Sequence, residues 1–214
     1  MVTKRIEVMN NLGHRLVADL YIAAHGSPVV AFSHGLHSGR RSPRGTAIAE
    51  GLREIGFSTL LFDYTGHGES EGSEDEATPM QMAEDLKYFL DALESEGFSK
   101  IGLNGSSYGG AAALMRTAED ERVRALVLMY STMMACFDFK RPCYELAPKI
   151  KIPTLMIVGS NDHPILEENQ RFLEMLEGTK DLHVIEGAVH AFEEPAQIEE
   201  AMHTAVGWFK KYLA

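Results

Sequence analysis

The chain has 214 residues, of which 45% are hydrophobic and 24% are charged, and its formal net charge at pH 7 is -11. This length fits one domain with a substantial core, and the composition is ordinary for a globular protein. The negative charge argues against nucleic acids and anionic membranes as partners, because both select for Lys and Arg. We therefore expect a single domain over residues 1–214.

The sequence has no run of about 20 apolar residues, and its first residues lack the apolar centre of a signal peptide. We therefore expect a cytoplasmic protein. Cys136 and Cys143 are seven residues apart in an expected loop. A disulfide is one option, but two free thiols fit a reducing compartment better.

In chain order, the first expected elements are two strands at residues 6–9 and 16–22, which flank the turn sequence Asn10-Asn11-Leu12-Gly13 and predict an antiparallel hairpin. Further strands are expected in nearly continuous apolar runs, which favour a parallel sheet covered on both faces. These runs are Val29–Phe32, Phe57–Phe62, Ile101–Leu103, Ala125–Tyr130, Thr154–Val158 and Leu182–Ile185.

The segments between the apolar runs have the pattern of helices. Thr78 and Pro79 form a capping signal, and apolar residues then recur at helical spacing from Met82 to Leu93. The same spacing recurs from Ile198 to Leu213. Strands that alternate with such helices predict an α/β fold, a three-layer αβα sandwich around a mostly parallel eight-stranded sheet.

The segment Gly105–Gly109 matches Gly-x-Ser-x-Gly, with Ser107 in the centre. The pentapeptide alone is a weak signal, but here an apolar strand leads into it and an alanine-rich helix leads out. Such a sharp turn strains the backbone of its middle residue, and the positions two residues away must lack side chains. Gly105 and Gly109 meet this requirement for Ser107, whereas Ser106 has larger residues at the same offsets.

This turn suits a nucleophile. It lifts the Ser107 hydroxyl clear of the sheet and directs a helix N-terminus at it, where the dipole and free N–H groups favour developing negative charge. The alternative is a glycine-rich turn with a passive serine. A phosphate-binding loop fits less well, because the sequence has neither Gly-Lys-Ser/Thr nor Gly-x-Gly-x-x-Gly.

A nucleophilic serine needs a base, usually a histidine held by a carboxylate. Among nine histidines, His190 follows the last expected strand and precedes the final helix. Asp162 ends another strand run and is the first choice for the acid, and Asp138 is the second. Because parallel strands end at one edge of a sheet, Ser107, Asp162 and His190 are predicted to converge there.

Five segments together resemble the α/β-hydrolase superfamily, and the resemblance extends over essentially the whole chain. In order, they are Ser33–Leu36, Asp63–Ser70, Gly105–Gly109, Gly159–Asp162 and Gly187–Phe192. The resemblance implies the α/β-hydrolase fold and an oxyanion hole made of the backbone N–H groups of Leu36 and Tyr108. It also implies that Asp63 and Ser70 brace the site and take no part in the chemistry.

Within this superfamily the chain resembles small bacterial carboxylesterases of the cinnamoyl/feruloyl-esterase and dienelactone-hydrolase-like kinds. Feruloyl esterases carry a sizeable cap before the acid-bearing strand, whereas only residues 133–152 are available for one here. This departure puts a feruloyl substrate in doubt and predicts a shallow, open site. Dienelactone hydrolases usually carry a cysteine nucleophile, where this chain has a serine.

Apolar side chains near the expected strand ends suit an acyl chain or a small aromatic group. We predict substrate contacts from His37, Met133, Met134, Phe137, His163, Ile165 and Phe192. For Met133, Met134 and Phe137 the alternative is a small core beneath a surface loop. His34 and His37 form a His-x-x-His with no cluster of carboxylates or cysteines beside it, so no metal site is predicted, and the proposed chemistry needs no cofactor.

The sequence thus predicts a serine carboxylesterase that cleaves small esters through an acyl-enzyme. Thioesters and lactones are alternative substrates for the same residues. An alternative of another class is a non-catalytic module that binds a small ligand on the same fold. The expected partner is a small-molecule ester, and the oligomeric state stays open, with a homodimer as one option.

Overall fold

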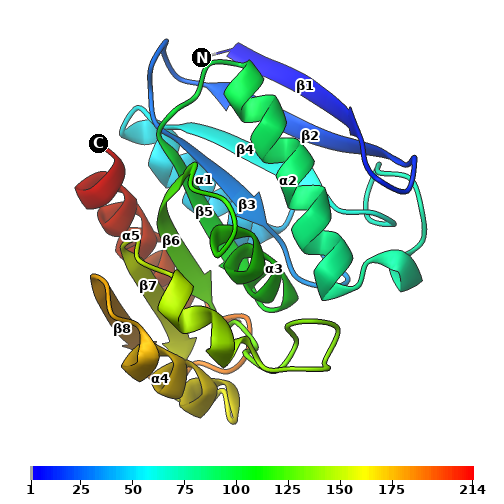
Figure 1. The fold of residues 1–214 in the computed structure, drawn as a ribbon. Helices are drawn as coiled ribbons and strands as arrows, with labels where there is room; N and C mark the ends of the chain where they lie inside the picture. The colour runs from blue at the N-terminus through cyan, green and yellow to red at the C-terminus, as the bar shows by residue number, and fades with distance from the viewer. Residues whose placement is uncertain (1) are drawn as a thin grey trace.

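The structure, a computed structural model, describes residues 2–214, and eight strands in this range form one sheet in the order β1-β2-β4-β3-β5-β6-β7-β8 (Figure 1). β2 pairs antiparallel with both β1 and β4, and every other neighbouring pair is parallel. The mostly parallel sheet and its N-terminal hairpin are therefore confirmed. The strands are β1 (Val2–Met9), β2 (Arg15–Ile22), β3 (Val29–Ser33), β4 (Ser58–Asp63), β5 (Ile101–Ser106), β6 (Val123–Met129), β7 (Thr154–Gly159) and β8 (Lys180–Ile185).

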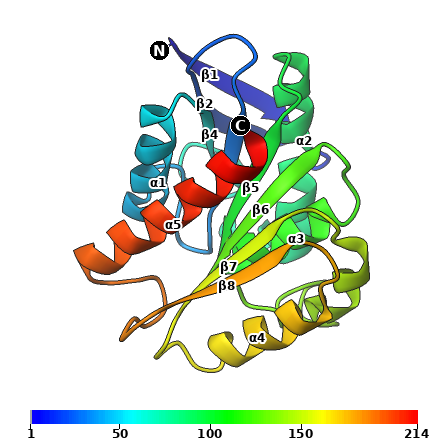
Figure 2. The same cartoon turned by 90° about the vertical axis from the view of Figure 1, so that its left-hand side faces the viewer.

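Helices cover both faces of the sheet, which confirms the three-layer sandwich (Figure 2). One face carries α1 (Pro43–Glu54) and α5 (Pro195–Leu213). The other carries α2 (Pro79–Ser95), α3 (Tyr108–Thr117) and α4 (Ile165–Met175). Because both faces are covered, β3, β4 and β7 are buried at every position, as their continuous apolar sequences predict.

Local sequence signals start two of the helices. The Thr78 side chain accepts a hydrogen bond from the Gln81 N–H at 3.3 Å, and α2 begins at the proline that follows Thr78. The Ser42 side chain likewise accepts from the Gly45 N–H at 3.2 Å, and α1 also begins at a proline. A proline costs nothing at a first helical position, where the N–H has no partner within the helix.

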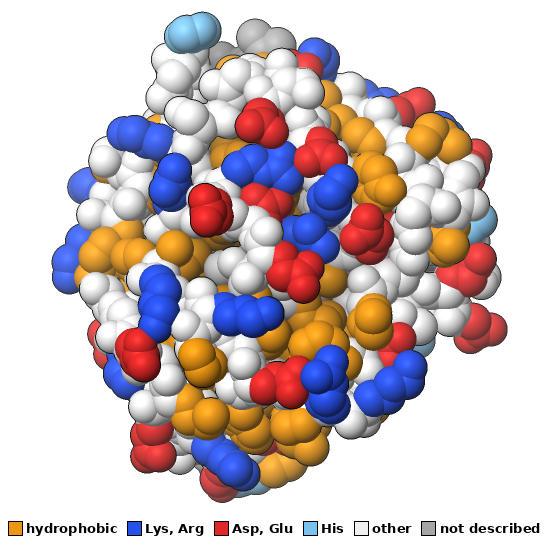
Figure 3. Space-filling model, in the orientation of Figure 1, with side chains coloured by type: hydrophobic (Ala, Val, Ile, Leu, Met, Phe, Trp, Pro, Cys, Tyr) orange, Lys and Arg blue, Asp and Glu red, His pale blue; other side chains and the backbone are white. Residues whose placement is uncertain are grey.

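The sheet separates two apolar clusters, one under α2 and α3 and the other under α1 and α5. The surface over α2 and α3 mixes charges of both signs with apolar side chains (Figure 3). No helix within residues 2–214 has the length and apolarity that crossing a bilayer requires.

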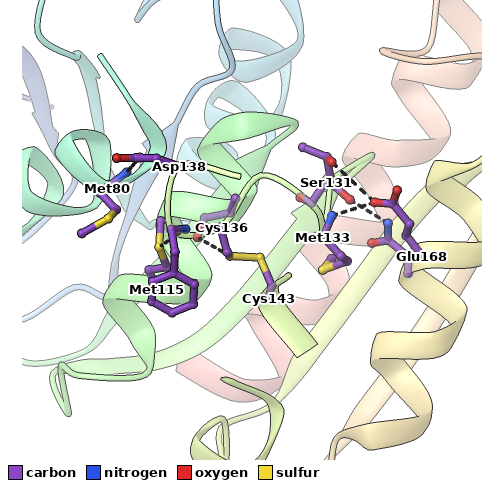
Figure 4. Close-up of a disulfide and its surroundings, with 12 residues drawn as sticks. Met80, Met115, Ser131, Met133, Cys136, Asp138, Cys143 and Glu168 are labelled. Carbon is purple, nitrogen blue, oxygen red and sulfur yellow. Dashed lines mark hydrogen bonds between the residues drawn. A yellow bond between two sulfur atoms is a disulfide. The ribbon is translucent and has the colours of Figure 1, made fainter. Parts of the chain in front are cut away.

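The segment between β6 and β7 contains a loop and the 3-10 helix Cys143–Lys149 (Figure 4). Cys136 and Cys143 form a disulfide, so the prediction of two free thiols is wrong. Their Cα atoms are 5.1 Å apart, within the range that a disulfide requires. The Met133 N–H donates to Glu168 Oε2 at 2.9 Å, and the Cys143 N–H donates to the Met133 carbonyl at 2.7 Å. The first bond fastens the loop to α4, and the second joins its two ends.

Candidate active site

Ser107 lies in the turn between β5 and α3, with φ 51° and ψ -122°. Few residues with a side chain adopt this region of backbone space, so neighbouring interactions must hold the turn. The Ser107 N–H donates to the Met129 carbonyl at 3.0 Å, and the Ser107 carbonyl accepts from the Gly110 N–H at 3.0 Å. The predicted strained strand-to-helix turn is present, with the serine at its tip.

Two glycines give this turn the space it needs. A Cβ added to Gly105 would lie 2.8 Å from the Gly110 Cα, and one added to Gly109 would lie 2.3 Å from the carbonyl oxygens of Ser33 and His34. Contacts this short do not occur between real atoms, so both positions require glycine. For Gly109 the neighbouring group is the backbone at the end of β3 and just after it.

His190 lies between Ser107 and Asp162. Its Nε2 is 3.2 Å from Ser107 Oγ, and its Nδ1 is 2.9 Å from Asp162 Oδ2. An ionised carboxylate only accepts, so Nδ1 carries the proton, and Nε2 is left to accept the serine proton. Asp162 is 6% exposed, whereas the His190 side chain is 45% exposed. Asp138, the second choice of acid, instead accepts a hydrogen bond from the Met80 N–H at 3.0 Å.

Bonds between the loops after β7 and β8 hold the acid near the base. The Asn161 N–H donates to the Ala188 carbonyl at 2.9 Å, and the Gly187 N–H donates to Ser160 Oγ at 2.8 Å. The Tyr130 ring packs edge-on against the His190 ring, with their centroids 4.9 Å apart. The imidazole is therefore oriented from two sides.

The turn after β3 lies directly against the nucleophile, because a Cβ added to Gly35 would be 3.1 Å from the Ser107 Cβ. Tyr108 follows Ser107 in sequence, and Leu36 follows Gly35 and lines the same cavity as Ser107. Neither backbone N–H group donates a hydrogen bond to any group within residues 2–214. Two such free donors beside a nucleophile are what an oxyanion hole requires.

His34 fixes the shape of this turn. Its Nδ1 donates to the Gly35 carbonyl at 2.8 Å, and its Nε2 accepts from the Tyr64 N–H at 3.2 Å. Burial lowers the pKa of His34 to about 4, so the ring is neutral near pH 7. Both ring nitrogens are occupied, and His37 instead pairs with Glu74 at 2.9 Å. Among the described residues, no three or more His, Cys, Asp or Glu gather as a metal site would require.

Asp63 and Ser70 form a second polar cluster at the same edge of the sheet. The Asp63 carboxylate accepts from the N–H groups of Arg40 and Glu69 at 2.8 and 3.0 Å and pairs with the Arg40 guanidinium. The Ser70 hydroxyl donates to the Asp63 carbonyl at 2.7 Å and accepts from the Val17 N–H at 2.9 Å. These bonds tie the loop 63–70, which we name the brace loop, to the segment just before α1 and to the hairpin.

A cavity of about 130 Å³ opens beside Ser107 and His190, on the α1 side of the sheet. Apolar side chains of Phe32, Leu61 and Met129 line part of it. Its polar lining includes Arg44, Asn104, Ser106 and Tyr130, none of which the sequence analysis assigned to the site. One signal could have identified Arg44: Ser42 and Pro43 mark a helix start just after the turn that carries Leu36.

None of the seven residues predicted to contact substrate lines this cavity. Met133 and Phe192 are 0% and 1% exposed within the apolar core, so neither side chain reaches the surface of the site in this structure. Phe137 and Ile165 pack against the core, and His37, Met134 and His163 lie in exposed positions. Contact of the seven residues with a part of the substrate outside the cavity stays a prediction.

The fold and the arrangement of Ser107, His190 and Asp162 define the structural class of the protein. The family model for the alpha/beta hydrolase fold matches residues 28–142 of this chain, so the chain belongs to the α/β-hydrolase fold family. The resemblance found in the sequence is thereby confirmed.

Among known proteins, the chain is 33% identical over 189 residues to a Mycobacterium tuberculosis protein whose name assigns it, provisionally, to the phosphoribosyl transferases. The match covers 86% of this chain but 41% of that protein. The thiohydrolase aneE of Aspergillus aculeatus is 31% identical over 139 residues, which are 62% of this chain and 42% of aneE. The chain thus spans about two fifths of the length of both relatives.

Among solved structures, the dienelactone hydrolase from Anabaena variabilis is 31% identical to this chain. The two superpose with a TM-score of 0.83 over 99% of each chain. The name of that structure is that of a hydrolase, and together with the family match it supports a hydrolase.

Proposed function

We propose that this protein is a serine hydrolase that cleaves small carboxylic esters through an acyl-enzyme intermediate. The observation that carries the proposal is the line of three side chains from Ser107 Oγ through His190 to Asp162, with contacts of 3.2 and 2.9 Å. These distances and the strained backbone of Ser107 are the features that nucleophilic catalysis by serine requires.

In the first half of the reaction, Ser107 Oγ attacks the ester carbonyl carbon while His190 Nε2 takes the hydroxyl proton. Asp162 stabilises the imidazolium that forms and holds its ring in place. His190 then returns this proton to the departing alkoxide, which leaves as the alcohol. The acyl group stays on the serine as an ester.

In the second half, a water molecule takes the place of the alcohol. His190 removes one of its protons, the hydroxide adds to the acyl carbon, and the proton goes to Ser107 as the acid leaves. In both halves the N–H groups of Leu36 and Tyr108 would hold the oxyanion. Loss of one such donor typically costs about 3 kcal/mol of transition-state stabilisation.

Thioesters are the second candidate substrates, on the same residues. The name of the relative aneE is that of a thiohydrolase, and that relative is 31% identical to the chain over 139 residues. A thioester needs the same nucleophile, base and oxyanion donors, and differs only in a thiolate leaving group. The comparison of oxygen esters with thioesters of equal acyl length separates the two.

The test is a chain-length series of p-nitrophenyl esters, from acetate to octanoate, on the wild-type protein and on Ser107→Ala. The proposal predicts turnover that falls as the acyl chain outgrows the small cavity, and loss of turnover for every ester in the variant. Undiminished hydrolysis by Ser107→Ala would mean that another residue does the chemistry. No turnover of any ester or thioester by the wild-type protein would favour a non-catalytic binding module.

A further inference from the structure

The cavity beside Ser107 contains a cation that the protein itself leaves unpaired. Two arginines line it, Arg40 and Arg44. Arg40 pairs with Asp19, Asp63 and Glu69, so its charge is neutralised within the protein. Arg44 makes no ion pair with any Asp or Glu of residues 2–214, although it is half-buried.

The position of Arg44 in its helix adds to this charge. Arg44 is the second residue of α1, and the first turn of α1 carries no acidic residue. A helix N-terminus carries partial positive charge, which favours anions and disfavours a cation. An arginine at this position opposes that preference of the helix N-terminus. The guanidinium and the helix N-terminus are both positive, and together they favour an anion in the cavity.

Asn104 supplies a second, independent observation. It is 2% exposed, lies on β5 and lines the same cavity. Its Oδ1 is buried without a hydrogen-bond partner. Its Nδ2 donates no hydrogen bond to another group among residues 2–214. A buried amide that pairs with nothing costs about 1–3 kcal/mol. Oδ1 and a carboxylate both only accept, so the group that Asn104 can offer to an anion in the cavity is its Nδ2 donor.

Tyr130 and Ser106 complete the polar wall. Burial raises the pKa of the Tyr130 hydroxyl, while the neighbouring Arg44 and Ser106 act to lower it. The hydroxyl therefore stays protonated and can donate a hydrogen bond near pH 7. The wall thus offers one full positive charge, two hydroxyls and an amide around a small volume.

We propose that this cavity binds a carboxylate at the far end of the acyl group, with Arg44 as its main partner and Asn104 donating from its amide. The proposal rests on the proposed function, because it assigns the substrate class of the same site. A planar guanidinium can hold a carboxylate through two parallel hydrogen bonds.

The size and the place of the cavity select the acyl side of a short ester. A volume of about 130 Å³ is the share of roughly four water molecules in the liquid, so only a few heavy atoms fit. The acyl part stays on Ser107 through both halves of the reaction, whereas the alcohol must leave before water attacks. A pocket under a helix therefore suits the part that stays. The substrate class is a monoester of a short dicarboxylic acid, which water converts to the dicarboxylate and the alcohol.

The test compares two ethyl esters of equal shape, monoethyl succinate and ethyl levulinate. Ethyl levulinate carries a methyl ketone where monoethyl succinate carries its carboxylate. The wild-type protein should show a kcat/KM for monoethyl succinate at least about tenfold above that for ethyl levulinate. Arg44→Gln should lower this ratio by about tenfold or more. Asn104→Leu, which removes the amide at similar volume, should lower the ratio by a smaller factor. This variant provides the test if Arg44→Gln fails to fold.

Arg41→Gln is the matched control. It removes the same charge three residues away, where the side chain is 81% exposed and points to Glu69. It should leave the ratio within about twofold of the wild-type value, because exposed charges are screened by water and salt. The proposal is overturned if the wild-type protein prefers the levulinate ester, or if Arg44→Gln and Arg41→Gln change the ratio equally.

Titration calorimetry with succinate separates this proposal from the proposed function. If no ester is turned over but succinate binds and Arg44→Gln weakens that binding at least tenfold, the anion site stands and the esterase proposal fails. If esters are turned over but succinate binding does not depend on Arg44, the esterase proposal stands and the anion site is wrong.

Discussion

Two polar regions lie side by side at the carboxyl edge of the sheet, and they differ in how fully their groups are paired. In the brace loop, the Asp63 carboxylate accepts from two backbone N–H groups and from the Arg40 guanidinium. At the nucleophile, the N–H groups of Leu36 and Tyr108 donate to no group within residues 2–214, and Arg44 pairs with no carboxylate of this range. Full pairing stabilises structure, whereas unpaired donors held in place are available to a substrate.

The sharpest contrast is between the two arginines, which stand four residues apart. The Arg40 side chain is 3% exposed and meets three carboxylates. Arg44 lines the cavity beside Tyr130 and pairs with no carboxylate of residues 2–214. The same residue type thus serves the fold in one position and, on our account, a ligand in the other. Substitutions in the two regions should separate these roles.

The largest effect is expected near the nucleophile, from the substitution His190→Gln. This variant should lower kcat/KM for p-nitrophenyl acetate by about 10⁴-fold or more, because the serine loses its base. Steady-state kinetics measure this, with circular dichroism to show that the fold is kept. His183→Gln is the control, because His183 pairs with Glu200 on the surface. A loss below about tenfold in His190→Gln would remove this residue from the mechanism.

Substitutions that disturb the brace loop should change the stability of the protein. Arg40→Gln leaves the buried Asp63 carboxylate without its charged partner and should lower the free energy of unfolding by about 3–5 kcal/mol. Arg44→Gln removes no ion pair and should cost less than about 1 kcal/mol. Urea denaturation of both variants measures the difference. Equal losses would mean that Arg44 is also a structural residue.

The turn after β3 should make stability depend on pH. The pKa of His34 is about 4 in the folded protein and near 6.5 in an unfolded chain, so the unfolded state binds more protons between these values. Stability should therefore fall as the pH is lowered from 6.5 to 4, by about 3 kcal/mol from this residue. In urea denaturation at several pH values, His34→Gln should flatten this part of the profile. An unchanged slope would contradict the buried neutral ring.

The smallest effect is expected from the disulfide. Cys136 and Cys143 close a loop of eight residues, and opening so small a loop should cost about 2 kcal/mol of unfolding free energy. Thermal unfolding with and without a reductant measures this, and no other cysteine is present to confuse the result. The Cys136→Ser, Cys143→Ser double variant should match the reduced protein and be insensitive to the reductant. A variant as stable as the oxidised protein would contradict the expectation.

The sequence predicted what depends on local pattern. Continuous apolar runs placed the strands, and the glycines on both sides of Ser107 indicated the strained turn. His190 and Asp162 followed because parallel strands end at one edge, so three residues distant in sequence could be placed together. These inferences needed only periodicity and chain order.

What the sequence missed depends on the direction in which side chains point. Met133 and Phe192 follow strand ends, as the prediction required, but they turn into the core. Arg44 lies on the side of α1 that faces the cavity, and Asn104 lies on the corresponding side of β5. Periodicity alone did not show which side faces the cavity. The disulfide was missed because its pairing depends on a loop that brings two Cα atoms within 5.1 Å.

The most direct test of the central claim is the covalent adduct with a fluorophosphonate, located by peptide mass spectrometry. An activated hydroxyl at the strained turn should take up the probe on Ser107 in the wild-type protein. Ser107→Ala should take up none, and Ser106→Ala should still be labelled at residue 107. A wild-type protein that stays unlabelled, or that carries the probe on another residue, would contradict the account.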